Sequence, residues 1–290
     1  MKRFTYAEPK NLAEVVSLIR QYGASASILA GGTDLINHIS HGKLSPEIVV
    51  SLRSVAELSK TVAENSEGLE IGALATLTTV AEHPLVRQRY TALAEAAVKV
   101  GSKQIRNRGT VVGNVCNASP AADTVTALLL FDPVLCILGE GGRRKVALSE
   151  FLLGPGQTTL AAAELVENIF LPTPIKPTAS TYLKLSRREG VDLATVGVAT
   201  SVDLSGNVRI ALGAVGPKAF RAFSAELQLK GAPRDAARLE RAIRLAQDAA
   251  NPISDLRASS EYRCEMVGVL LRQALQQAMA RCEREEGRCS

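Results

Sequence analysis

The sequence predicts an α+β protein built from two successive parts. Short apolar strands alternate with amphipathic helical segments along the chain, and a proline cluster at Pro172–Pro177 divides it. The pattern also changes after that cluster, where strands come first and charged helices follow. At 290 residues, 46% of them hydrophobic, the chain is long enough for two or three cores.

Residues 1 to about 60 are predicted to form a small open β-α-β subdomain. Asn11 and Glu14 have the spacing of a helix capping box. The predicted elements are a helix whose apolar face carries Leu12, Val15, Val16 and Ile19, and strands at Ser27–Leu29 and Ile48–Leu52. The first strand leads directly into Gly31–Gly32.

The segment from Leu69 to Leu171 mixes short strands with two helices. Its predicted elements are strands at Leu69–Ala73 and between Gly109 and Gly113, helices at Ala92–Val100 and Thr124–Phe131, and a hairpin at Gly139–Arg144 with a solvated basic face.

An α+β C-terminal domain is predicted after the proline cluster. Its elements are strands at Thr181–Ser186 and Asn207–Val215 and helices at Ala236–Ala249 and Ala258–Ala280. The charged tail Arg281–Ser290 is expected to be frayed or solvated.

Composition excludes several classes of protein. The net charge is +5, but the basic residues are scattered, aromatic residues make up only 4% and Trp is absent, which argues against nucleic-acid binding. Neither a secretory signal nor a membrane-spanning apolar run is present, so a cytoplasmic protein is expected. The five cysteines include no CxxC pair, which predicts reduced thiols and no metal site in this chain.

Two glycine-rich turns, Ala30–Leu35 and Thr110–Asn114, carry the functional prediction. Glycine lets backbone N–H groups approach a diphosphate closely, and consecutive N–H groups form an anion-binding concavity. Polar side chains follow the second turn at Asn117 and Ser119, and buried polar groups need partners. The two turns together predict a dinucleotide cradle.

Simpler interpretations stay open for each turn alone. The second turn could be an ordinary surface loop before a helix that begins at Asp123, and Gly31–Gly32 could be a tight strand-to-helix turn. Neither turn has a Walker lysine or the G-x-G-x-x-G spacing, so the common nucleotide folds fit poorly.

Several motifs follow one another in the order and spacing of a known family. They are Ala30–Leu35, Ile71–Ala73, Gln104–Asn107, Gly113–Asp123, Tyr182–Arg188, Asp192–Ala194, Asp255–Ser259 and Tyr262–Arg263. Over about residues 1 to 280 the chain resembles the FAD-binding medium subunits of the xanthine dehydrogenase and carbon monoxide dehydrogenase family. The resemblance implies a two-lobed FAD-binding domain of the vanillyl-alcohol-oxidase (PCMH) type over residues 1–175, with lobes at about 1–60 and 61–175. A CO dehydrogenase flavoprotein C-terminal domain follows over residues 176–290.

The resemblance also implies roles for individual residues toward a non-covalently bound FAD. The first turn would wrap the diphosphate with Leu29, Ala30, Gly31, Gly32, Thr33, Asp34 and Leu35. Thr110, Gly113 and Asn114 would hold the diphosphate and the ribityl chain, and Asp123 would bind a sugar or ribityl hydroxyl. Lys184 would reach the isoalloxazine region, where a cation stabilises negative charge on the reduced flavin. No acid or base catalyst and no metal ligand is implied.

One residue departs from the family pattern. Val112 stands where the family usually has glycine, and valine strongly disfavours a positive φ. Cys116, inside the same motif, is interpreted as a small buried hydrophobic residue. His38, His41 and His83 lie outside any motif expected for covalent flavin attachment.

The implied function is that of an electron-transfer subunit of a molybdenum hydroxylase. A small subunit with [2Fe–2S] clusters and a large molybdopterin subunit would be its partners, in a dimer of heterotrimers. Electrons would pass from the clusters to FAD and on to NAD⁺ or another acceptor. Purines, aldehydes, aromatic heterocycles and carbon monoxide stay open as substrates, with purines slightly favoured by Gly101–Asp123.

Two alternatives remain from the sequence. One is a self-sufficient FAD-dependent reductase or oxidase on a related fold. The other is a non-enzymatic scaffold that has lost its flavin, for which Val112 is the one hint.

Overall fold

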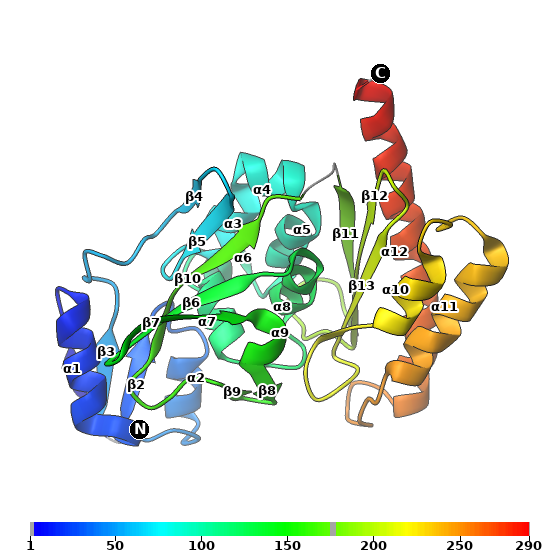
Figure 1. Ribbon diagram of the computed structural model, residues 1–290. Helices are drawn as coiled ribbons and strands as arrows, with labels where there is room; N and C mark the ends of the chain where they lie inside the picture. The colour runs from blue at the N-terminus through cyan, green and yellow to red at the C-terminus, as the bar shows by residue number, and fades with distance from the viewer. Residues whose placement is uncertain (1–2, 175–177, 290) are drawn as a thin grey trace.

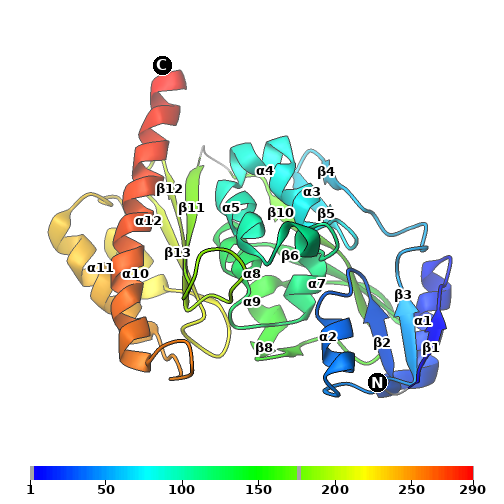
Figure 2. The same cartoon turned by 180° about the vertical axis from the view of Figure 1, so that it is seen from behind.

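Three main β-sheets lie in a row along an elongated molecule, and each contributes to a hydrophobic core of its own (Figures 1 and 2). The computed structural model describes residues 3–174 and 178–289, with side chains up to residue 284. Helices and strands alternate irregularly through it, so the predicted α+β class is confirmed. Within the proline cluster, residues 175–177 lie outside the described residues.

The N-terminal sheet is parallel and small. Its strands, in spatial order, are β1 (Thr5–Ala7), β3 (Ile48–Ser51) and β2 (Ala26–Leu29). Helix α1 (Leu12–Tyr22) packs on the sheet, and the short helix α2 (Leu35–Ser40) follows the first glycine turn. Half of the predicted capping box is confirmed, because the N-cap Asn11 Oδ1 accepts from the Glu14 N–H at 2.9 Å; Glu14 Oε2 accepts instead from the N–H of Lys10, the residue before the N-cap, at 2.8 Å.

The central sheet is antiparallel. Its strands, in spatial order, are β4 (Val62–Glu64), β5 (Gly68–Gly72), β10 (Leu165–Pro172), β6 (Val134–Gly139) and β7 (Gly142–Ala147). The predicted hairpin is β6–β7, but its basic pair is not simply solvated: Arg143 pairs with Glu167 and Arg144 with Glu164, both at 2.7 Å.

Short helices and a small second hairpin complete the central part. They are α3 (Leu77–Glu82), α4 (Pro84–Arg89), α5 (Thr91–Lys99), α6 (Lys103–Arg106), α7 (Val111–Cys116), α8 (Asp123–Leu128), α9 (Leu148–Phe151), β8 (Leu152–Gly154) and β9 (Gln157–Thr158). The two predicted helices correspond to α5 and to α8 with its 3₁₀ extension Leu129–Phe131.

The strand predicted between Gly109 and Gly113 is wrong. That segment enters helix α7, and its only strand-like feature among the described residues is a single bridge between Thr76 and Thr110. The Thr110 hydroxyl accepts from the Gly113 N–H at 2.9 Å, so an N-cap decides the local structure against the β-branched Val111 and Val112.

The C-terminal sheet is sandwiched between helices. Its antiparallel strands are β11 (Thr178–Leu185), β12 (Val196–Asp203), β13 (Val208–Gly213) and β14 (Phe220–Arg221). Helices α10 (Phe223–Leu229), α11 (Ala236–Ala249) and α12 (Ser260–Cys289) cover one side, and α5 and α8 pack on the other (Figures 1 and 2). Because side chains alternate along a strand, Ala199 joins the central core while its neighbour Val198 joins the C-terminal core.

The tail predicted to be frayed or solvated is the end of α12, which continues to Cys289, and of its described side chains Glu283 and Arg284 are exposed. Arg281 pairs with Glu95 of α5 at 2.6 Å and donates to the Ser180 carbonyl at 2.6 Å, and Cys282 is buried. Sequence periodicity could not reveal these contacts, because their partners lie in other parts of the chain.

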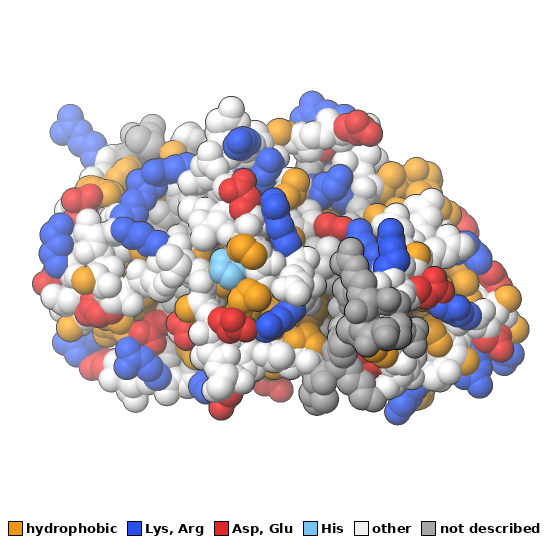
Figure 3. Space-filling model, turned by 90° about the horizontal axis from the view of Figure 1, so that it is seen from above, with side chains coloured by type: hydrophobic (Ala, Val, Ile, Leu, Met, Phe, Trp, Pro, Cys, Tyr) orange, Lys and Arg blue, Asp and Glu red, His pale blue; other side chains and the backbone are white. Residues whose placement is uncertain are grey.

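Charge is mixed on the surface. Lys and Arg side chains are interspersed with Asp and Glu over the face seen in Figure 3. Within residues 3–174 and 178–289, no helix has both the length and the apolar character that crossing a membrane requires.

Candidate functional site

The two glycine turns predicted to cooperate are in direct contact. A Cβ added to Gly31 would overlap the Arg108 carbonyl oxygen and would lie 2.7 Å from the Gly109 Cα. Gly32 has φ +84°, a left-handed conformation that glycine adopts without strain. The fold therefore needs glycine at both positions, for two different reasons.

The first turn presents unsatisfied backbone donors. Among the described residues no hydrogen-bond acceptor is found for the N–H groups of Gly31, Gly32, Thr33 and Asp34. Buried or half-buried backbone donors are normally paired, and consecutive free N–H groups form an anion-binding concavity. Donors arranged in this way suit an anionic group.

A cavity of about 830 Å³ opens against both turns. Its walls come from the N-terminal part, the central part and the β11–β12 loop of the C-terminal part, which contributes Val191, Asp192 and Leu193. The volume lies within the range of about 300–1,000 Å³ that is usual for cofactor pockets.

Comparison with known proteins decides the family. Residues 2–174 match the family model of the FAD binding domain in molybdopterin dehydrogenase, and residues 181–278 match that of the CO dehydrogenase flavoprotein C-terminal domain. The chain belongs to the FAD-binding subunits of the molybdopterin dehydrogenases. It is an oxidoreductase subunit of the molybdenum hydroxylase family.

The relatives match along nearly their whole length. The FAD-binding subunit is 34% identical to the carbon monoxide dehydrogenase medium chain of Hydrogenophaga pseudoflava, over 97% of this chain and 98% of that one. It is 32% identical to the nicotinate dehydrogenase FAD-subunit of Eubacterium barkeri, over 92% of this chain and 93% of that one. A solved structure of carbon monoxide dehydrogenase from Hydrogenophaga pseudoflava superposes with a TM-score of 0.92 at 33% identity, covering 97% of this chain and 99% of that chain.

The cavity fits FAD by the chemistry of its donors. The free N–H groups of the first turn suit a diphosphate, and Asn114, Asn117 and Ser119 add polar side chains to the lining. The Thr124 hydroxyl donates to Asn114 Oδ1 at 2.6 Å and so orients that amide.

Most of the residues predicted to bind FAD line this cavity. Those that do are Ala30, Gly31, Gly32, Thr33, Asp34, Leu35, Thr110, Gly113, Asn114 and Asp123. Leu29 and Lys184 are not part of the wall. The buried Leu29 packs beneath the first turn with Ile39 and Val49, where it supports the turn from behind.

Lys184 reaches the cavity only through Asp123. Its Nζ lies 3.0 Å from Asp123 Oδ2 and donates to the Lys99 carbonyl at 3.1 Å, and only 4% of its side chain is exposed. The Tyr182 hydroxyl donates to Asp123 Oδ1 at 2.6 Å. The structure thus brings Asp123 and Lys184 together, with Asp123 between the cation and the cavity.

Burial dominates the protonation behaviour of this group. Desolvation raises the pKa of Asp123, and the Lys184 charge opposes that rise. Burial and the neighbouring carboxylate also raise the pKa of Tyr182 well above its usual value, so its phenol stays a hydrogen-bond donor. Sequence reasoning assigned no role to Tyr182, because only the fold shows that Tyr182 and Lys184 both bind Asp123.

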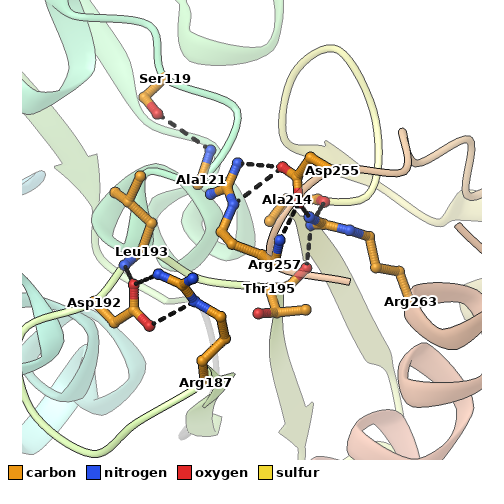
Figure 4. A network of polar contacts seen from close by, with 10 residues as sticks. All are labelled: Ser119, Ala121, Arg187, Asp192, Leu193, Thr195, Ala214, Asp255, Arg257 and Arg263. Atoms are coloured by element: carbon orange, nitrogen blue, oxygen red, sulfur yellow. Dashed lines mark hydrogen bonds and ion pairs between the residues drawn. The ribbon is translucent and has the colours of Figure 1, made fainter. Parts of the chain in front are cut away.

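An ion pair within the β11–β12 loop holds the loop's own conformation beside the cavity. Arg187 binds both carboxylate oxygens of Asp192 at 3.3 Å, and Asp192 also accepts from the Leu193 N–H at 2.9 Å (Figure 4). The Arg187 guanidinium lowers the pKa of Asp192. The aliphatic neighbours Val191 and Leu193 remain about half exposed at the cavity.

A buried arginine on α12 connects this loop to the segment that follows the second turn. Arg263 donates to the Thr195 carbonyl at 2.7 Å and to the Ala214 carbonyl at 3.2 Å, and it pairs with Asp255 at 2.7 Å (Figure 4). The Ala214 N–H in turn donates to the Pro120 carbonyl at 2.8 Å. The C-terminal motif Asp255–Arg263 therefore sets the position of cavity-lining segments on two different parts of the chain.

Val112 and Cys116 have ordinary roles in the structure. Val112 lies in helix α7, and it is not among the described residues with a positive φ, so valine is tolerated there without backbone strain. Burial raises the pKa of the Cys116 thiol to about 12, which keeps it protonated near neutral pH. Cys116 was interpreted as a small buried hydrophobic residue; it packs against the central core but is only half-buried and lines the cavity.

Metal binding has no support in the part of the chain that the structure describes. No group of three or more His, Cys, Asp or Glu side chains is placed there to hold a metal ion.

Proposed function

We propose that this subunit receives electrons from [2Fe–2S] clusters of a partner chain and passes them to NAD⁺ or another acceptor. The partners are an iron–sulfur small subunit and a molybdopterin large subunit, in a dimer of heterotrimers. Bound FAD supplies the redox chemistry. The substrate is chosen in the molybdenum subunit, and relatives named for carbon monoxide and for nicotinate support that placement.

The observation that carries the proposal is the cavity built on two glycine turns and completed by the β11–β12 loop. In the proposed division, residues 1–175 form the FAD domain, with lobes at about 1–60 and 61–175. Residues 176–290 form the C-terminal domain that closes the cavity.

We assign the residues as follows. The backbone of Ala30–Leu35 holds the diphosphate, and Leu29 supports that backbone from below. Thr110, Gly113 and Asn114 hold the diphosphate and the ribityl chain of FAD. Asp123 accepts a hydrogen bond from a sugar or ribityl hydroxyl. Lys184 keeps Asp123 in place and contributes its positive charge from behind that carboxylate.

The protein's part in the reaction is binding, orientation and electrostatic tuning. The proposal assigns no acid or base catalyst to this chain, and bound FAD would supply the redox chemistry. The low exposure of Asp123 and Lys184 excludes water from the pair, so its charges act in a medium of low dielectric.

The absorption spectrum of the purified chain is the first test. We expect flavin bands, and FAD as the species released by heating and identified by chromatography. A colourless protein that does not bind added FAD would contradict the proposal.

Isolation of the native enzyme from its source organism is the second test. We expect the iron–sulfur and molybdopterin chains to co-purify in a fixed ratio with this one. An active native enzyme made of this polypeptide alone would instead support a self-sufficient FAD-dependent reductase or oxidase.

A further inference from the structure

Arg53, just after strand β3, holds the first glycine turn from the side away from the cavity. Its Nε donates to the Ala30 carbonyl at 3.2 Å and its Nη2 donates to the Gly31 carbonyl at 3.3 Å. The half-buried Arg53 does not line the cavity itself. The planar guanidinium fork thus binds two successive carbonyl groups of the same turn.

The planarity of the peptide bond gives this contact a consequence for the cavity. In a trans peptide the C=O and the following N–H point in opposite directions. If Arg53 holds the carbonyls of Ala30 and Gly31, the N–H groups of Gly31 and Gly32 are directed to the other side. These are two of the N–H groups that have no acceptor among the described residues.

The charge of Arg53 acts in the same direction. Within the described part of the chain, no carboxylate lies within ion-pair distance of this guanidinium. A cation bound to a carbonyl polarises the peptide unit and strengthens its N–H as a donor. An uncompensated positive charge therefore stands behind the turn that receives the anion.

We propose that Arg53 is a positioning residue of the FAD site: it aligns the peptides of the first turn and makes the turn selective for the diphosphate. This inference rests on the proposed function, because it assigns that turn to the diphosphate. Arg53 acts through the backbone and makes no contact of its own with the cavity.

The test compares FAD with riboflavin, which lacks both phosphates, on the full-length chain freed of flavin. In Arg53→Ala we expect the Kd for FAD to rise about 10- to 100-fold, the range of a lost charged hydrogen bond. The Kd for riboflavin should stay within about twofold, because the turn does not contact the ring system in this assignment. The matched control is Arg20→Ala, which removes an exposed arginine of the same lobe that pairs with Glu140.

Arg53→Lys tests the positive charge separately from the guanidinium geometry that binds two carbonyls. Lysine keeps the cation but cannot align two carbonyls with one planar group, so we expect an intermediate loss of FAD affinity. The salt dependence of FAD binding should stay as in the wild type in Arg53→Lys and weaken in Arg53→Ala. If Arg53→Ala does not fold, the same comparison of FAD and riboflavin affinities is made with Arg53→Lys, and a selective loss of FAD affinity supports the inference.

Two results would overturn the inference alone: Arg53 variants that bind FAD as tightly as Arg20→Ala, or an equal loss of affinity for FAD and riboflavin. The second result would mean that Arg53 only supports the lobe. A wild-type chain that binds neither flavin would overturn the proposed function and this inference with it.

Discussion

The two turns of the cavity use different chemistry for one task. The first turn offers backbone: its side chains are absent at Gly31 and Gly32, and its N–H groups lack acceptors among the described residues. The second turn offers side chains: its backbone enters helix α7, and Thr110 already occupies the Gly113 N–H. The comparison shows glycine meeting two needs in the first turn, a close approach to Arg108 at Gly31 and a positive φ at Gly32, whereas the second turn accommodates Val112 in a helix.

The largest expected effect comes from Asp123, which follows the second turn and lines the cavity. Asp123→Asn leaves the buried Lys184 cation without its carboxylate, so the free energy of unfolding should fall by about 3–5 kcal/mol. Urea denaturation measures this change. The double variant Asp123→Asn with Lys184→Met removes the orphaned charge and should recover most of the loss. A double variant no more stable than the single one would contradict a charge-based explanation.

Gly31→Ala breaks the first turn. The added methyl group overlaps the Arg108 carbonyl, and overpacking of this kind costs about 1–3 kcal/mol of unfolding free energy. Because the two turns must separate to admit it, the flavin content of the purified variant should fall to a small fraction of the wild-type value. Gly141→Ala is the control, since a Cβ there meets nothing within 4 Å. Full flavin content in Gly31→Ala would show that the contact between the turns is dispensable.

Thr110→Val tests the capped helix of the second turn. It keeps the β-branched shape and removes the hydroxyl that accepts from the Gly113 N–H, a loss worth about 1 kcal/mol. Thermal unfolding of the variant and of Thr110→Ser, which retains the hydroxyl, measures the difference. Equal stability of the two variants would rule out capping as the role of Thr110.

The smallest effect is expected at Val112, and it sharpens the comparison most directly. Because the residue sits in a helix, Val112→Gly should be less stable than Val112→Ala by about 0.5–1 kcal/mol. Flavin titration should find no tighter FAD binding in Val112→Gly than in Val112→Ala. Tighter binding by the glycine variant would mean that the second turn, like the first, needs glycine's backbone freedom.

The sequence predicted much of the fold where local pattern decides it. The capping box at Asn11, the strands around the first turn, helices α5 and α11 and the β6–β7 hairpin all depend on residues close in the chain. The prediction failed where tertiary contacts or a single cap decided the outcome. The Thr110 cap starts helix α7 where the sequence predicted a strand. Arg281, at the start of the predicted tail, is held by Glu95 and the Ser180 carbonyl.

The candidate site, like the fold, was predicted where local motifs mark it and missed where distant residues contribute. Motif residues pointed to both turns, which lie on one cavity in the structure. Sequence alone could not place Lys184 behind Asp123, connect Arg53 to the first turn, or connect Arg263 to the β11–β12 loop, because each acts through a carbonyl or carboxylate of a distant segment. A residue that hydrogen-bonds to backbone leaves no local pattern at its partner.

Because the cavity wall comes from three parts of the chain, bound FAD stabilises their packing against one another. A ligand that binds only the docked arrangement stabilises it in proportion to the logarithm of its concentration, by about 2.7 kcal/mol at one hundred times Kd. Flavin supply therefore governs more than activity. We expect the flavin-free chain to be less stable than the FAD-bound chain, and limited proteolysis should cut it faster.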